Sequence, residues 1–174
     1  MIKEDHYIAK VFPSNKAALY LQEKELLEKL THNNILKPIS SDFELVGRLS
    51  YFLKSDILLF TEVRRGNFLE YIHTKGALSE QTSKFYINQL IDALIYCDQK
   101  TNMTHPNLTL DNMLMNQDRN LLLCGWCNSC QTGNGSSISS TAFRIGELII
   151  NLVTSRALFI SKDLKSDPYA KFLS

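Results

Sequence analysis

The chain has 174 residues, of which 44% are hydrophobic and 21% charged, and its formal net charge is +1. This balance is that of an ordinary globular domain, and the near-neutral charge gives no general attraction to nucleic acid or to an anionic membrane. No apolar run approaches the roughly 20 residues of a membrane-spanning helix, and the polar N-terminus lacks a signal peptide's apolar stretch. We therefore expect a cytoplasmic protein with reduced cysteines that binds neither membrane nor nucleic acid.

The first third of the chain predicts strands around one helix. Residues 7–12 form a short apolar strand that Pro13 ends, and leucines at helical spacing follow as far as Leu30. Residues 43–52 and 57–63 are both strand-like. We expect Lys54, Ser55 and Asp56 between them to form a hairpin turn, which gives a small sheet with one helix.

The remainder predicts mainly helices. A short helix is expected over residues 68–73, and Ser79 is a plausible N-cap for a long helix through Cys97 with a wide apolar stripe. A last helix over residues 142–154 also has one apolar side.

Two short strands lie between these helices. Residues 113–115 and 121–123 are apolar and flank a turn, whereas residues 128–141 are rich in Ser, Gly, Asn and Thr and are expected to form a loop. Strands and one helix followed by helices predict an α+β fold, with a small mixed lobe before a mainly helical one.

Short motifs in a fixed order resemble those of the protein kinase family. Residues 7–10 (YIAK) are similar to the strand with the family's phosphate-binding lysine, and residues 23–35 (EKELLEKLTHNNI) to the helix whose glutamate pairs with it. Residues 105–114 (HPNLTLDNML) stand where the family has H-R-D-L-K-P-E-N-x-L. Residues 143–148 (FRIGEL) look like the start of its buried central helix.

The resemblance extends over nearly the whole chain, from Tyr7 to Phe172. It implies a protein-kinase-like two-lobed α+β fold in which residues 1–174 form a single domain. Residues 1–62 would be a reduced N-lobe sheet with one helix, and residues 63–174 a truncated, mainly helical C-lobe.

The same resemblance implies a nucleotide site. Lys10 and Glu23 would form the ion pair that holds phosphates, although a surface lysine and a solvated helix charge would also explain them. The resemblance also implies that Thr61 guards the ATP pocket and that Glu62 and Val63 lead into the hinge. Asn112 would lie on the magnesium side, and Leu114 would stack on the nucleotide base.

Three positions lack the family's chemistry. Asn107 replaces the catalytic aspartate, and a neutral amide cannot take the hydroxyl proton of a substrate. Thr109 replaces the loop lysine, and Gly125 the metal-binding aspartate of D-F-G, if Gly125-Trp126-Cys127 is the correct register. The register one residue earlier, which begins at Cys124, contains no aspartate either. ATP would then bind without efficient magnesium coordination.

Other parts of the family's machinery are also missing. Gly47 is the first glycine, so no glycine-rich loop precedes Lys10, and the segment between Cys127 and Thr141 is very short. The core remains, because Leu27, His105 and Trp126 match a column of side chains that the family stacks through both lobes.

We therefore expect a pseudokinase-like scaffold or adaptor that has lost phosphoryl transfer. Because the truncated C-lobe would leave the helix over residues 142–154 partly uncovered, it would bind a protein partner within a larger assembly. The alternatives are a minimal serine/threonine protein kinase with residual ATP binding, and a fragment or decaying copy of a longer kinase.

The cysteines give a third interpretation. Cys124, Cys127 and Cys130 have a C-x-x-C-x-x-C spacing that suits zinc or an iron–sulfur cluster, with Cys97 or His105 as a fourth ligand. Buried thiols beside a loop explain the same spacing, and this family has no thiolate metal site here. The functional alternative is a metal-binding interaction module.

Overall fold

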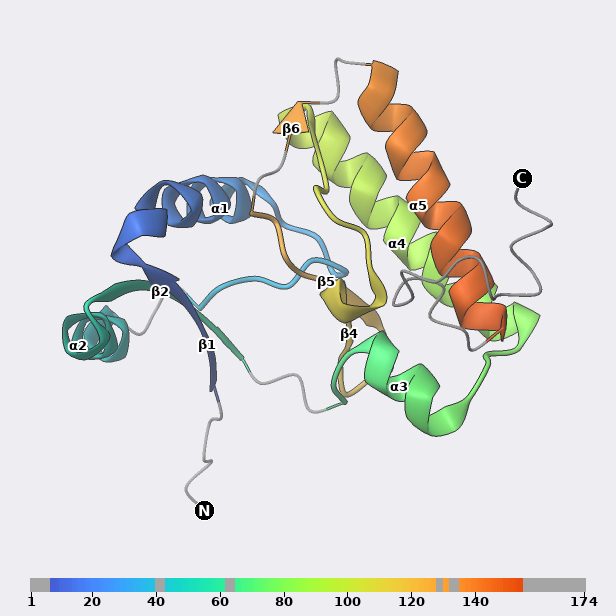
Figure 1. Ribbon diagram of the computed structural model, residues 1–174, viewed down its shortest axis with the longest axis horizontal. Helices are drawn as coiled ribbons and strands as arrows, with labels where there is room; N and C mark the ends of the chain where they lie inside the picture. Colours follow the sequence, from blue (N-terminus) through green and yellow to red (C-terminus); the bar gives the residue numbers. More distant parts are fainter. Residues whose placement is uncertain (1–6, 40–42, 62–64, 128–129, 132–134, 155–174) are drawn as a thin grey trace, which may run out of the picture.

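A computed structural model describes residues 7–39, 43–61, 65–127, 130–131 and 135–154. Its helices and strands lie in two groups (Figure 1). The sheet formed by β1 and β2 lies with α1 and α2 on one side, and α3, α4 and α5 lie on the other, with the β4–β5 hairpin between. This is the small α+β lobe followed by a mainly helical one that the sequence predicts. Within the described residues, no helix is long and apolar enough to cross a membrane.

The first group is built on two antiparallel strands. β1 (Tyr7–Pro13) pairs along its whole length with β2 (Ser55–Thr61), and a one-turn 3₁₀ helix, η1 (Ser14–Lys16), leads from β1 into α1 (Ala17–Lys29). The leucine spacing predicts this helix correctly, because Leu26 and Leu27 are buried on its inner side. β1 confirms the strand predicted over residues 7–12, and β2 confirms the one predicted over residues 57–63 as far as Thr61, since residues 62 and 63 lie outside the described residues.

The strand predicted over residues 43–52 is wrong, because the chain forms a helix there, α2 (Phe43–Leu53). Val46, Leu49 and Ser50 are partly buried while Gly47 and Arg48 are exposed, which is the spacing of one helix face. A short apolar run cannot be assigned to helix or strand from periodicity alone. The predicted hairpin turn is therefore a link from α2 to β2, made at Lys54 with φ 48°.

The second group begins with a helix and a hairpin. α3 (Phe68–Lys75) starts at Asn67, whose side chain accepts a hydrogen bond from the Glu70 backbone N–H. The 3₁₀ turn η2 (Leu110–Asn112) precedes β4 (Met113–Met115), which pairs antiparallel with β5 (Leu121–Leu123). The hairpin confirms the two strands and the turn that the sequence predicts.

The long helix α4 (Glu80–Thr101) also agrees with its prediction. The Ser79 side chain accepts a hydrogen bond from the Thr82 N–H, and Asn102 ends the helix in the left-handed conformation. Leu90 and Ala93 on its inner side are fully buried.

The loop predicted over residues 128–141 is wrong where the structure describes it. β6 (Cys130–Gln131) pairs with β3 (Met103–Thr104), and α5 (Gly135–Thr154) begins seven residues before the predicted start at residue 142. Serine and threonine have only moderate helix propensity, so their composition favoured a loop. Packing of α5 on α4 through residues such as Leu148 and Leu152 outweighs that local preference.

The two groups share one hydrophobic core. It runs from Phe12 on β1 to Leu152 on α5 and includes the fully buried Trp126. The segment after α1 fastens the groups together, because the Leu36 N–H donates to the Leu123 carbonyl at 3.0 Å and the Leu123 N–H donates to the Asn34 carbonyl at 2.8 Å. The strand β5 is therefore held from both sides, and the residues after it are placed beside α1.

Candidate functional site

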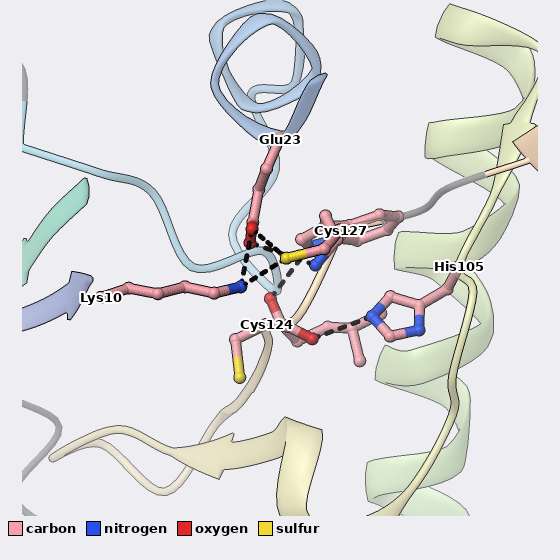
Figure 2. A network of polar contacts seen from close by, with 7 residues as sticks. Lys10, Glu23, His105, Cys124 and Cys127 are labelled. Carbon is pink, nitrogen blue, oxygen red and sulfur yellow. Dashed lines mark hydrogen bonds and ion pairs between the residues drawn. The ribbon is translucent and has the colours of Figure 1, made fainter. Parts of the chain in front are cut away.

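Three side chains from separate elements converge where β1, α1 and the segment after β5 meet (Figure 2). Lys10 extends from β1, Glu23 from α1, and Cys127 from the residues after β5. The Lys10 Nζ lies 2.6 Å from the Glu23 Oε2, so the structure forms the ion pair that the motif spacing implies.

Glu23 is the buried member of this cluster. Its side chain is 1% exposed, whereas that of Lys10 is 34% exposed. Its second carboxylate oxygen, Oε1, accepts a hydrogen bond from the Trp126 backbone N–H at 3.2 Å. A carboxylate at this depth is stable only when it is paired and hydrogen-bonded, and Glu23 satisfies both conditions.

Cys127 is the contact that sequence reasoning missed. Its Sγ lies 2.8 Å from the Lys10 Nζ, which donates to it, and the thiol donates to the Glu23 Oε2 at 2.5 Å. Burial, followed by the hydrogen bond to Glu23, raises the pKa of Cys127, and the nearby Lys10 only partly offsets this. The contact with Glu23 requires the neutral thiol, which can also accept the hydrogen bond from Lys10.

The charge of Lys10 is set by two opposing effects. Burial lowers the pKa of an ammonium group, but the hydrogen bonds to Cys127 and Glu23 and the negative charge of Glu23 together raise the pKa of Lys10 above its usual value. The ammonium is thus retained at neutral pH, and its partial exposure leaves it accessible to an anion.

An aromatic contact between His105 and Trp126 lies next to the Lys10–Glu23–Cys127 cluster. The rings of His105 and Trp126 meet edge to face with their centroids 4.6 Å apart. The Asn107 N–H donates to the His105 Nδ1 at 3.2 Å, so the Nε2 carries the proton and donates to the Cys124 carbonyl at 2.8 Å. Burial, with a minor contribution from Lys10, lowers the pKa of His105 to about 4, and the ring is therefore neutral. Leu27, the third member of the predicted column, is buried in the same core.

The loop before η2 holds the residues that would act on a substrate hydroxyl. Asn107 is exposed and Thr109 is partly buried. The Asn112 Nδ2 donates to the Asn107 carbonyl at 2.9 Å, and the Cys124 N–H donates to the Asn112 carbonyl at 3.0 Å. These hydrogen bonds connect the loop to the residues after β5, but neither Asn107 nor Thr109 supplies a base or a cation.

Gly125 is tightly enclosed by Asn112. It has φ +86°, and a Cβ added at this position would lie 2.7 Å from the Asn112 Oδ1 and 2.9 Å from its Cγ. Both the backbone conformation and the space favour glycine. A side chain at residue 125 would require the Asn112 side chain to move away from it.

The remaining predicted positions are only partly described. Thr61 ends β2 opposite Tyr7, while Glu62 and Val63 lie outside the described residues. Leu114 on β4 is partly buried and pairs with Leu122.

The cysteine cluster is also described in part. Cys127 contacts Lys10 and Glu23, and burial raises the pKa of Cys124 to about 11. Cys130 lies in β6, but its side chain is outside the described part of the chain. Of the suggested fourth ligands, Cys97 lies within hydrogen-bond distance of Thr101, and both His105 ring nitrogens are engaged by the chain itself. Among the described residues, no group of three or more His, Cys, Asp or Glu side chains could hold a metal ion.

Comparison with known proteins finds a match to a family model. The model described as the protein kinase domain matches residues 3–160. The probable serine/threonine-protein kinase MARK-B of Dictyostelium discoideum is 32% identical over 116 residues, which cover 65% of this chain and 15% of that protein. The testis-specific serine/threonine-protein kinase 2 of Mus musculus is 26% identical over 125 residues, which cover 70% of this chain and 33% of that protein.

A third relative has similar identity. The serine/threonine-protein kinase dkf-2 of Caenorhabditis briggsae is 31% identical over 109 residues, which cover 62% of this chain and 8% of that protein. The aligned part of the chain thus spans a third or less of the length of these relatives.

Proposed function

The chain belongs to the protein kinase domain family, and from that premise we propose that it is a catalytically inactive member that acts as a scaffold by binding a protein partner. The observation that carries this proposal is the packing of Asn112 against Gly125. In the family resemblance, residue 125 would supply the carboxylate that holds magnesium. Residue 125 is instead a glycine with φ +86°, and any side chain there would have to displace Asn112.

The acceptor side of the site supports the same proposal. Asn107 has no proton-accepting group, and general-base help typically contributes about 10²–10⁴ in rate. Within the described part of the chain, the carboxylate in contact with Lys10 is that of Glu23, which is buried and committed to Lys10, Cys127 and Trp126. Glu23 is therefore not free to serve as either base or metal ligand.

The scaffold role is supported by apolar side chains on α5. Phe143 is 65% exposed, Ile149 40% and Val153 39%, although the same helix buries Leu148 and Leu152 in the core. Apolar surface of this kind is typical of a protein–protein contact. We expect the isolated chain to self-associate or to have low solubility.

Analytical ultracentrifugation of the purified chain tests the scaffold proposal. The expected result is concentration-dependent association that decreases in a Phe143→Ser, Val153→Ser double variant. Phe85→Ser is the matched control, because Phe85 lies on α4 and is also partly exposed, at 49%. A stable monomer that is soluble at high concentration would contradict the proposal.

A second candidate is a minimal serine/threonine kinase with residual ATP binding. The specific observation in its favour is the Lys10–Glu23 ion pair at 2.6 Å, whose lysine side chain is partly exposed and carries the positive charge that a phosphate would meet. Without a metal carboxylate at residue 125, we expect ATP to bind independently of magnesium.

Thermal unfolding with ATP, with and without magnesium, tests this expectation. A ligand present at 100 times its Kd stabilises the folded state by about 2.7 kcal/mol, so binding is measurable as a rise in Tm. We expect a rise that magnesium does not change and that Lys10→Met removes. A rise that depends on magnesium would favour the minimal kinase over the inactive scaffold.

A further inference from the structure

The three cysteines whose side chains the structure describes differ in what they contact. Cys97 is buried in α4 and lies 3.6 Å from the Thr101 hydroxyl. Cys124 is partly exposed, and its contacts drawn in Figure 2 are made by its backbone. Cys127 is partly exposed and has an amino group and a carboxylate against its sulfur. It is the thiol of these three that lies against a nitrogen, which becomes nucleophilic once its proton is lost.

The geometry of the Lys10–Cys127 pair is that of two atoms already in contact. The Lys10 Nζ lies 2.8 Å from the Cys127 Sγ, and the Glu23 Oε2 lies within 2.6 Å of both. β1 and the segment after β5 are both fixed by backbone hydrogen bonds and core packing, so the pair does not depend on a chance side-chain encounter. Little movement would bring the nitrogen and the sulfur to bonding distance.

We propose that Lys10 and Cys127 form an oxidant-sensitive modification site, in which a peroxide joins the Lys10 nitrogen to the Cys127 sulfur as a sulfenamide. Sulfenic acids are known to condense with a nitrogen to give this linkage. The reactant is a small hydroperoxide such as hydrogen peroxide. The partial exposure of Lys10 and Cys127 admits a molecule of that size.

The reaction balances in two steps. In the first, the Cys127 sulfur attacks one peroxide oxygen, the S–O bond forms, the O–O bond breaks, and the thiol proton leaves with the departing oxygen as water. In the second, the Lys10 nitrogen attacks the sulfenic sulfur, the S–N bond forms and the S–O bond breaks with loss of a second water. The sulfur is oxidised by two electrons and the peroxide is reduced by two, and one proton is released from the ammonium.

Glu23 has a defined part in the second step. The amine must lose a proton before it can attack, and the Glu23 Oε2 lies 2.6 Å from the Nζ that carries it. The product has neither an ammonium nor a thiol, so Glu23 loses its ion pair with Lys10 and the hydrogen bond from the Cys127 thiol. The linkage also ties β1 covalently to the residues after β5 and removes the cation that would meet a phosphate.

The test uses the full chain and a variant in which Cys97, Cys124 and Cys130 are replaced by serine. Cys127 is then the sole cysteine, so no intramolecular disulfide can form. The folded variant is treated with hydrogen peroxide at mildly alkaline pH, because the raised pKa of Cys127 limits its thiolate at neutral pH. Intact mass should fall by two hydrogens, and proteolysis should give one peptide pair joined at Lys10 and Cys127 that dithiothreitol separates.

Lys10→Arg in the same background is the matched control, because arginine keeps the positive charge beside Glu23 but does not form this linkage. We expect it to stop at the sulfenic acid, which dimedone labels. If Cys127 of the Lys10-containing chain gains only oxygen, or does not react, or if the Lys10→Arg chain loses two hydrogens equally, the proposal is wrong. The peptide map of the unsubstituted chain gives the same answer if the serine variant does not fold, and this readout does not depend on nucleotide or partner binding.

Discussion

The two sides of the candidate site differ in which part of the family's chemistry they keep. On the side of β1 and α1, Lys10 and Glu23 form a short ion pair with a buried carboxylate. On the side of η2 and β5, Asn107 and Gly125 stand where the resemblance places a base and a metal ligand, and neither has a charge. The difference shows that a charged half-site and an uncharged one can share a single apolar core.

The shared core explains how this is possible. Trp126 is fully buried and its backbone N–H donates to Glu23, while its ring meets His105. These contacts connect the charged side to the uncharged side through backbone and ring groups. The packing therefore does not need an aspartate at residue 107 or 125.

The largest expected effect concerns His105, which both sides share. Because burial lowers its pKa from 6.5 to about 4, the unfolded chain binds a proton more readily than the folded chain between these values. The stability that the neutral ring contributes is present above pH 6.5 and is lost as the pH falls toward 4. One pKa unit corresponds to about 1.4 kcal/mol, so the free energy of unfolding should fall by up to about 3 kcal/mol.

Urea unfolding at a series of pH values measures this loss. His105→Gln should lower stability at neutral pH but flatten the dependence between pH 6.5 and 4, since glutamine does not titrate. An unchanged slope in this variant would mean that another group is responsible for the loss of stability.

A smaller change in stability is expected when Gly125 is replaced, and it should differ in sign from the change at Gly47, a glycine inside a helix. Gly125→Ala should destabilise the chain by about 1–2 kcal/mol, because it forces a Cβ to within 2.7 Å of Asn112 at φ +86°. Gly47→Ala is the matched control: it lies inside α2 with nothing within 4 Å of the added Cβ, and should stabilise by roughly 0.5–1 kcal/mol.

Chemical denaturation of both variants tests this difference. If Gly125→Ala is neutral or stabilising, residue 125 has room for a side chain, and the steric argument against a metal carboxylate fails.

The sequence predicted the framework better than the details of the site. Long periodic segments such as α4, with Ser79 as its cap, agree with the structure because their apolar spacing and capping chemistry point to the same element. The sequence predicts a strand where α2 forms, because the conformation of a short apolar run with mixed spacing depends on the surface that it packs against. The early start of α5 was missed for a similar reason, since its first turns are rich in serine.

The sequence predicts the charged pair of the site, Lys10 and Glu23, but not the contact that Cys127 makes with them. The motif spacing identified Lys10 and Glu23 because each lies in an element with a recognisable pattern. The spacing of Cys127 to Cys124 and Cys130 suggests a metal ligand, whereas the structure places Cys127 against Lys10 and Glu23. The sequence separation of 117 residues between Lys10 and Cys127 leaves no local signal for that contact.

The measurement that tests the account most directly is transfer of radiolabelled phosphate from ATP, with magnesium or manganese present, by the purified chain and by Lys10→Met. The account predicts incorporation no higher in the unsubstituted chain than in the variant, on itself or on a general protein substrate. Incorporation that Lys10→Met abolishes would contradict it, because the chain would then transfer phosphate without a carboxylate at residue 107 or 125.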